Sequence, residues 1–207
     1  DTRFAIEEWT VEAWVRPDAA GAADSLLVHR DVAAGETNFF LGLDTSWQVT
    51  AGFGTNVLAT TNVIDVTGST NWTHLAASYK KAGQILTIYI DGAEVTNRVC
   101  SANPRFSGVG PVVQRIGVEY EGLMDEVRIW RGVRTTNELQ EAMSSVLLGS
   151  EIGLVAYYRF DDGTSWSSGS QFTSLESGWN HGQVEDFVTD WGQNWKRNWH
   201  EAATVQG

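Results

Sequence analysis

The chain contains 207 residues, of which 42% are hydrophobic and 19% are charged, and its formal net charge is −12. This hydrophobic content excludes wholesale disorder and is enough for one β-sandwich or two small domains. An acidic chain repels phosphate backbones, and no apolar run reaches the ~18–20 residues of a membrane span, so we expect neither a nucleic-acid partner nor membrane insertion. Excess carboxylate instead suits a cation such as calcium, although acidity also serves solubility alone.

Strict alternation of apolar residues begins in WTVEAWVRP, residues 9–17. Because successive side chains of a strand point to opposite faces, this pattern predicts a strand with one buried face. Pro17 is expected to end the strand, since proline cannot donate to a ladder. The residues of the apolar face are Trp9, Val11, Ala13 and Val15.

Further short strands follow, with turn signals about every ten residues. They are SLLVHRD, NFFLGLD, WQVTAGFG, NWTHLAASYK, QILTIYIDGAEV, VQRIGVE and GLMDEVRIW. Asp91–Gly92 is a strong tight-turn signal between two of them. About ten strands in this arrangement predict an all-β sandwich or barrel. The lone cysteine, Cys100, is expected to be a packed thiol, and it excludes an intrachain disulfide.

One helix is predicted after the last of these strands, in RTTNELQEAMSSVLLG. Thr135 and Glu138 have the spacing of a capping box, and Gly149 suits the C-terminal stop. The expected apolar stripe of this helix consists of Leu139, Met143 and Leu147.

Three motifs occur in order between Trp9 and Met143: W-x-H-x-A in NWTHLAASYK, Y-x-D-G in TIYIDGAEV, and M-D-E-V-R-I-W in GLMDEVRIW. Their combination resembles the laminin G-like jelly roll domain of the concanavalin A-like lectin/glucanase superfamily. The resemblance implies an antiparallel β-sandwich of two sheets packed face to face, with the short helix after its last core strand.

GLVAYYRFDDG, residues 153–163, resembles the strand that typically opens this family, and LESGWNHGQV, residues 175–184, resembles the loop that follows it. The family's first strand therefore stands in last place. We expect residues 1–150 to form the jelly roll core with its closing helix. Residues 151–185 would complete this or a neighbouring sandwich, with the chain's own sheet favoured, and residues 186–207 would form a Trp-rich tail or linker.

A calcium site is predicted from two acids at strand ends. In GLMDEVRIW, alternation places Asp125 on the same face as Leu123, Val127 and Ile129, where a buried carboxylate needs a partner. Asp162 ends the apolar face of the later strand. If the strands pair, the two carboxylates repel unless a cation lies between them. The resemblance also implies calcium near this acid, and the full candidate ligand set is Asp125, Asp162, Asp161, Glu176 and Asn180. Alternatively, Asp125 caps a turn or pairs with Arg128 or Arg159.

No catalytic constellation stands out. Glu119 and Glu121 have the alternate spacing of glucanase carboxylates, but the strand context that the resemblance requires is missing, so we expect no enzyme. Tryptophans within predicted strands or at their ends are expected to pack in the core or between the sheets, namely Trp14, Trp47, Trp72 and Trp130. Those in the less regular C-terminal sequence are candidates for ligand or partner contact, namely Trp179, Trp191, Trp195 and Trp199.

We therefore expect a non-catalytic secreted module of binding or adhesion, outside the cell or at its surface. Its partners would be a glycan or an extracellular protein, and its structural cofactor would be Ca²⁺. The alternative is a structural subunit of a filament or tandem-repeat fibre, in which copies of the chain contact one another by strand donation or through the tail. A more distant alternative is the carbohydrate-binding module of a glycoside hydrolase.

Overall fold

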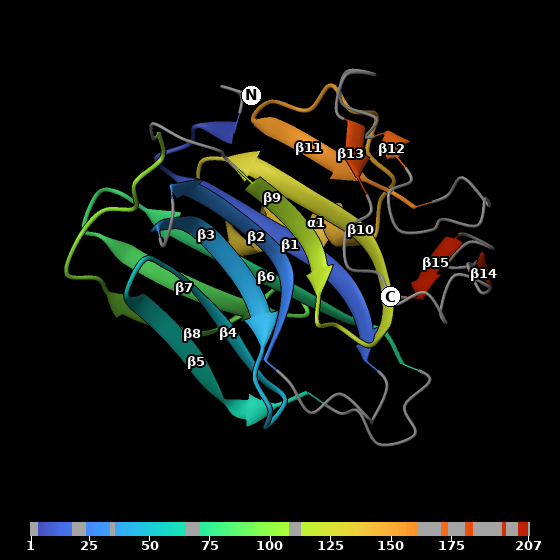
Figure 1. Cartoon of the computed structure of the whole chain (residues 1–207), viewed down its shortest axis with the longest axis horizontal. Coiled ribbons are helices and arrows are strands. Elements are labelled where there is room, and N and C mark those ends of the chain that lie inside the picture. The colour runs from blue at the N-terminus through green and yellow to red at the C-terminus, as the bar shows by residue number, and fades with distance from the viewer. Residues whose placement is uncertain are drawn as a thin grey trace.

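A computed structural model describes residues 4–17, 24–33, 36–64, 71–107 and 113–160 in detail, and four short strands beyond them. Two antiparallel sheets pack face to face, and Figure 1 shows the five-stranded sheet in front of the larger one. The predicted all-β sandwich is therefore confirmed.

The larger sheet contains six strands in the order β11–β10–β1–β6–β7–β8. Their bounds are Trp9–Pro17 for β1, Thr73–Lys80 for β6, Ile85–Ile90 for β7, Ala93–Val99 for β8, Gly122–Arg131 for β10 and Leu154–Tyr158 for β11. Two shorter strands, β15 (Ala203–Gln206) and β14 (Lys196–Arg197), continue the sheet where β15 pairs with the start of β10.

The smaller sheet has the order β5–β4–β3–β2–β9. Its strands are β2 (Ser25–Ala33), β3 (Glu36–Leu43), β4 (Gln48–Phe53), β5 (Asn56–Val63) and β9 (Val113–Val118). Among the described residues, ten strands thus precede the helix, which agrees with the prediction of about ten, although β5 is not among the predicted segments. The strands β12 (Gln171–Thr173) and β13 (His181–Gln183) pair only with each other.

The main core lies between the two sheets, and β1 supplies one wall of it. The alternation of β1 is confirmed, because its predicted apolar residues Trp9, Val11, Ala13 and Val15 are all fully buried in this core. Aromatic rings from both sheets meet there, with Phe53 edge-on to Tyr79 at 4.8 Å between ring centroids. Full burial of each large apolar side chain stabilises the fold by about 1.5–3 kcal/mol.

A β-bulge in β10 changes which residues face this core. Two residues of β10 lie opposite Ala13 of β1, and Glu126 adopts a positive φ of 52°. Met124 and Val127 therefore point into the core, while Asp125 points away from it, beside its cross-strand neighbour Trp14. The expectation that Asp125 shares the core face is wrong, because one extra residue reverses the alternation on one side of a bulge.

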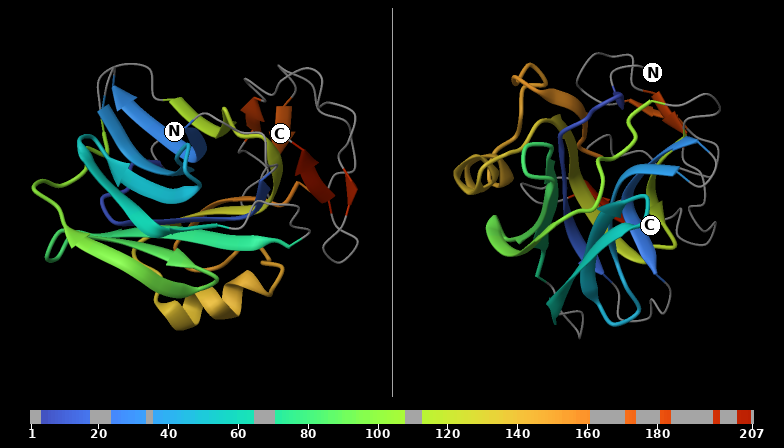
Figure 2. Two further views of the ribbon diagram at one scale, coloured as in Figure 1. Left: turned by 90° about the horizontal axis from the view of Figure 1, so that it is seen from below. Right: turned by 90° about the vertical axis from the view of Figure 1, so that its left-hand side faces the viewer.

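The helix α1 spans Thr136–Met143 and has the predicted capping box, in which Thr135 and Glu138 bond reciprocally. It ends at Met143, before the stop favoured at Gly149, and Leu147 is buried beyond the helix rather than on its stripe. Figure 2 shows α1 against the outer side of the larger sheet, away from the five-stranded sheet. Residues under α1 are thus sealed from solvent.

The strand β11 pairs antiparallel with β10 of the same chain, so the segment that resembles a first strand occupies the chain's own sheet. Ala156, Tyr158 and Phe160 face the main core as the alternation predicts. Leu154 does not, because a register shift at Val155 turns it toward Trp130 on the outer side.

Candidate functional site

Of the predicted calcium ligands, only Asp125 belongs to the described residues; Asp161, Asp162, Glu176 and Asn180 lie outside them. Asp125 is buried, and its Oδ1 accepts a hydrogen bond of 2.8 Å from the backbone N–H of Glu126. A bulge leaves a ladder amide unpaired, so this carboxylate satisfies a group that the backbone cannot. Within residues 4–160, as far as they are described, no three acidic, histidine or cysteine side chains are grouped to hold a metal. Calcium stays a prediction.

The predicted contact residues Trp179, Trp191, Trp195 and Trp199 also lie outside the described residues. Two of the tryptophans expected to pack, Trp14 and Trp130, are buried on the outer side of the larger sheet rather than between the sheets. Trp47 packs against the main core. Trp72, in contrast, is partly exposed and belongs to no core cluster of the described part of the chain.

A buried polar network lies under α1 and joins strands that are far apart in sequence. Glu12 is fully buried, and its two oxygens accept hydrogen bonds from Trp130 Nε1 at 2.6 Å and from His74 Nε2 at 2.8 Å. Burial raises the pKa of the Glu12 carboxyl, but the hydrogen bond and charge of His74, with the charge of Arg128, lower the pKa below its ordinary value overall. His74 thus lies on β6, a central strand between β1 and β7.

The same network fixes α1 and β11. Arg128 donates to the carbonyls of Ala142 at 2.8 Å and Ser145 at 2.9 Å, and it pairs with the Glu126 carboxylate. The Ala142 carbonyl also accepts from the backbone N–H of Ser145, so Arg128 adds to a bond already present at the helix end, where a cation is favourable. The Tyr157 hydroxyl donates to Glu126, and burial together with this carboxylate raises the pKa of Tyr157. All members of the network are buried, and its hydrogen bonds tie α1 and β11 to the larger sheet.

An open hollow of about 700 Å³ lies between the end of β5, the start of β6 and the β7–β8 turn. We call it the Trp72 hollow. It is lined by Asn62, Val63, Ile64, Asn71, Trp72, Thr73, Ile90, Asp91 and Val95. An aromatic ring, amides, a carboxylate and aliphatic side chains therefore face one space, which has the size of a small-molecule site.

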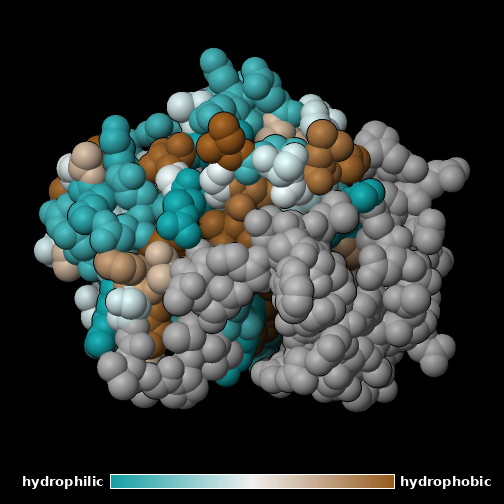
Figure 3. Space-filling model, turned by 90° about the horizontal axis from the view of Figure 1, so that it is seen from above, coloured by the Kyte–Doolittle hydropathy of each residue, from teal (hydrophilic) through white to brown (hydrophobic). Residues whose placement is uncertain are grey.

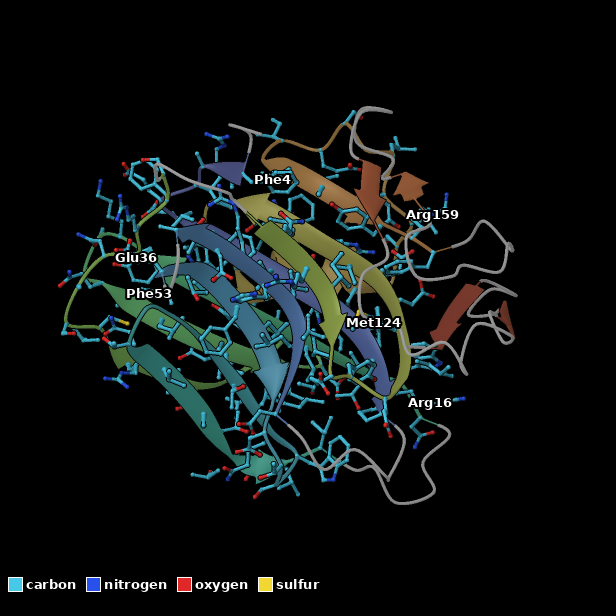
Figure 4. The ribbon with its side chains drawn as sticks, in the orientation of Figure 1. Phe4, Arg16, Glu36, Phe53, Met124 and Arg159 are labelled. Carbon is cyan, nitrogen blue, oxygen red and sulfur yellow. The ribbon has the colours of Figure 1, made fainter. Side chains whose placement is uncertain are left out.

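Trp72 lies just before β6 and is partly exposed. The guanidinium of Arg16 lies over its ring, 5.9 Å from the centroid, and this cation–π contact holds the indole from one side. Figure 4 places Arg16 at the end of β1, far from Glu36 at the opposite end of the sandwich. The sequence pattern predicts a packed role for Trp72, and this prediction is wrong, because β6 begins only at Thr73 and leaves Trp72 partly exposed before the strand.

Asp91 forms part of the tight turn that Asp91–Gly92 predicted, and both residues have positive φ. Its backbone N–H donates to the His74 carbonyl at 2.8 Å, and its Oδ1 accepts from the His74 N–H at 3.0 Å. Two bonds to one residue fix the carboxylate at the rim of the hollow. Local turn chemistry pointed to this residue, but no sequence signal placed it beside Trp72.

A second hollow, of about 640 Å³, lies at the other end of the strands, lined in part by Glu7, Glu8, Lys81, Phe106 and Arg131. Its charges already satisfy one another, because Lys81 pairs with Glu7 and the Lys81 backbone donates to Glu8 Oε1 at 2.8 Å. A ligand would have to displace these contacts.

On the face seen in Figure 3, hydrophilic residues cover much of the described surface, with smaller hydrophobic groups between them.

The family model of the Concanavalin A-like lectin/glucanases superfamily matches residues 1–140. The chain belongs to this superfamily. The name of the superfamily covers both lectins and glucanases. The spacing of Glu119 and Glu121, which resembles that of glucanase carboxylates, therefore has to be compared with the structure. Both lie in the turn between β9 and β10, on either side of the buried Tyr120, and Glu119 has a positive φ. They do not project side by side from a strand, as a glycosidase pair would.

Solved structures of the same jelly-roll type share the fold. A putative carbohydrate binding protein from Bacteroides ovatus has 19% identity and a TM-score of 0.61; the match covers 82% of this superfamily chain and 49% of that protein. The CBM40 of the Ruminococcus gnavus IT-sialidase has 14% identity and a TM-score of 0.54, over 68% of this chain and 84% of that one. The extracellular region of zebrafish Gpr126/Adgrg6 matches at 15% identity and a TM-score of 0.52, and the match covers 74% of this chain and 21% of that one.

The chain thus spans about half of the Bacteroides protein. No curated protein matches the sequence. The eight-residue α1 is far shorter than a bilayer crossing, and no other helix in the described part of this superfamily chain is long and apolar enough to span a membrane.

Proposed function

We propose that the chain is a non-catalytic carbohydrate-binding module that holds a glycan in the Trp72 hollow. The observation that carries this proposal is Trp72 itself, a partly exposed indole that shares a hollow with amides and a carboxylate. Pyranose rings stack on aromatic faces, while amides and carboxylates bond their hydroxyls. Two solved structures with the same fold, from Bacteroides ovatus and Ruminococcus gnavus, are named as carbohydrate-binding proteins, which supports this choice.

The decisive experiment compares wild type with Trp72→Ala on an oligosaccharide array, followed by calorimetric titration of the best ligand. Stacking of one sugar on one indole is worth about 1–3 kcal/mol by analogy with other ring stacking, so Trp72→Ala should weaken binding about 5-fold or more. Phe40→Ala is the matched control, because Phe40 is also a partly exposed aromatic but lies on β3 outside the core cluster. Unchanged affinity of Trp72→Ala would contradict the proposal.

The same proposal includes a secreted or cell-surface location and a structural calcium ion near Asp125. Removal of calcium with a chelator should then lower the melting temperature, and an unchanged melting temperature would contradict the ion. The alternative role, a building block joined to other copies by a donated strand, is less favoured, because β11 already pairs with β10 of its own chain. An extracellular protein partner is a further outcome that binding screens can reveal.

A further inference from the structure

We infer that the Trp72 hollow selects neutral sugar chains over acidic ones, and that Asp91 is the residue that makes this selection. The inference rests on the proposed function, because it names the ligand class of the same site. It follows from the charge of the lining, from the way Asp91 is held, and from the apolar surface beside it.

The lining carries a single formal charge among its described residues, the carboxylate of Asp91. The other lining residues are amides, a hydroxyl, an indole and aliphatic side chains. A uronate or sulfate group entering this space would face a like charge at short range, within a chain of net charge −12. Neutral hydroxyls would instead donate to the carboxylate.

Asp91 is held so that it can serve as a fixed acceptor. Its Oδ1 is used by the His74 N–H, at 3.0 Å, while no hydrogen bond to its Oδ2 is formed by the described residues. The backbone bond from Asp91 to the His74 carbonyl holds the same turn from the other side. An exposed carboxylate that need not reorganise forms charge-assisted hydrogen bonds to hydroxyls at small entropic cost.

None of the described residues that line the hollow is a cation. Arg16 lies over the Trp72 ring, and it is not one of the residues that line the hollow. Beside Trp72, the side chain of Val63 is 60% exposed and Val95 is partly exposed. The surface next to Asp91 therefore suits the C–H face of an uncharged sugar.

The test measures binding of paired oligosaccharides of equal length, a neutral chain and the corresponding uronate chain, by calorimetric titration at two salt concentrations. Wild type should bind the neutral chain at least about 10-fold more tightly, with little effect of salt. The uronate chain should bind better at high salt, because screening weakens the repulsion by Asp91.

Asp91→Asn separates the possible outcomes. This variant should bind the neutral chain about 10-fold more weakly, as expected when a hydrogen bond to a charged group is lost. The ratio of its affinities for the neutral and the uronate chain should also be smaller than in wild type. Asparagine tolerates positive φ and can still accept from the His74 N–H, so the turn should persist. The matched control is Asp44→Asn, whose Oδ1 accepts from Ser46 and Gln48 N–H groups at 2.8 and 2.9 Å in another turn.

The two proposals fail in different ways. If Trp72→Ala abolishes binding while the uronate chain binds as tightly as the neutral one, or Asp91→Asn has no effect, the hollow binds glycan but the inference about Asp91 is overturned. If Trp72→Ala leaves binding of every chain unchanged, or no chain binds, the proposed function falls and the inference with it.

Discussion

Two polar regions of the molecule meet at His74: a buried hydrogen-bond network on one side and the solvent-exposed Trp72 hollow on the other. The His74 side chain belongs to the buried network with Glu12, whereas its backbone N–H and carbonyl hold Asp91 at the rim of the Trp72 hollow. In the network, charges are closed off by α1 and satisfy one another. In the hollow, a carboxylate and an indole remain open to solvent. The comparison teaches that the buried ionisable groups of the network serve the stability of the fold, while the exposed carboxylate of Asp91 is available to a ligand.

The largest expected effect is on the network side. Glu12→Ala would leave His74 and Trp130 without their shared acceptor, and Arg128 without a nearby carboxylate, in a sealed space; loss of one partner of a buried pair costs about 3–5 kcal/mol. Chemical denaturation should show this loss in the free energy of unfolding. The control is Glu7→Ala, which removes an exposed ion pair with Lys81 worth at most about 1 kcal/mol. Equal stability of the two variants would break the comparison.

An intermediate effect is expected from acid. The pKa of Glu12 in the folded protein lies below its ordinary value of 4.5, so the folded state binds this proton more weakly than the unfolded state does. The stabilisation is therefore complete above about pH 4.5 and is lost as the pH falls through the folded pKa. Melting temperatures between pH 7 and pH 3 should decrease at the acidic end, and the decrease should be smaller in Glu12→Gln. A Glu12→Gln variant with the full acid dependence of wild type would assign the effect to other carboxyls.

The smallest effect on stability is expected in the hollow. Trp72→Ala removes a partly exposed ring and its contact with Arg16, which is worth about 0.5–1 kcal/mol at an exposed site. Its melting temperature should stay close to that of wild type even though its affinity for glycan falls. A destabilisation as large as that of Glu12→Ala would instead show that Trp72 mainly stabilises the fold.

Features with a local cause could be predicted from the sequence. The alternation of β1, the Asp91–Gly92 turn and the capping box of Thr135 and Glu138 all depend on residues within a few positions of one another. The order of the motifs also pointed to the sandwich and to a first-type strand in last place. The face of Asp125 was mispredicted because a bulge depends on the partner strand, and one extra residue in β10 reverses the alternation.

Contacts between residues that are far apart in the chain could not be predicted from the sequence. Glu12 and His74 are 62 positions apart, and Glu12 and Trp130 are 118 apart, so nothing local marks them as partners. Trp72 was assigned to the core because tryptophan near a strand is usually buried, and only the start of β6 at Thr73 leaves it at the rim.

By itself, the sequence determined the class of fold, the succession of most of its strands along the chain and the tight turn at Asp91–Gly92, since periodicity and turn chemistry act over short stretches of chain. Only the tertiary structure decided which polar residues became sealed and which stayed open. The covering of the larger sheet by α1 closed the space around Glu12, and the meeting of the ends of β5, β6 and β7 left Trp72 and Asp91 in a common hollow. Solvent access, which decides whether a polar group stabilises the fold or meets a ligand, is a property of packing between distant segments.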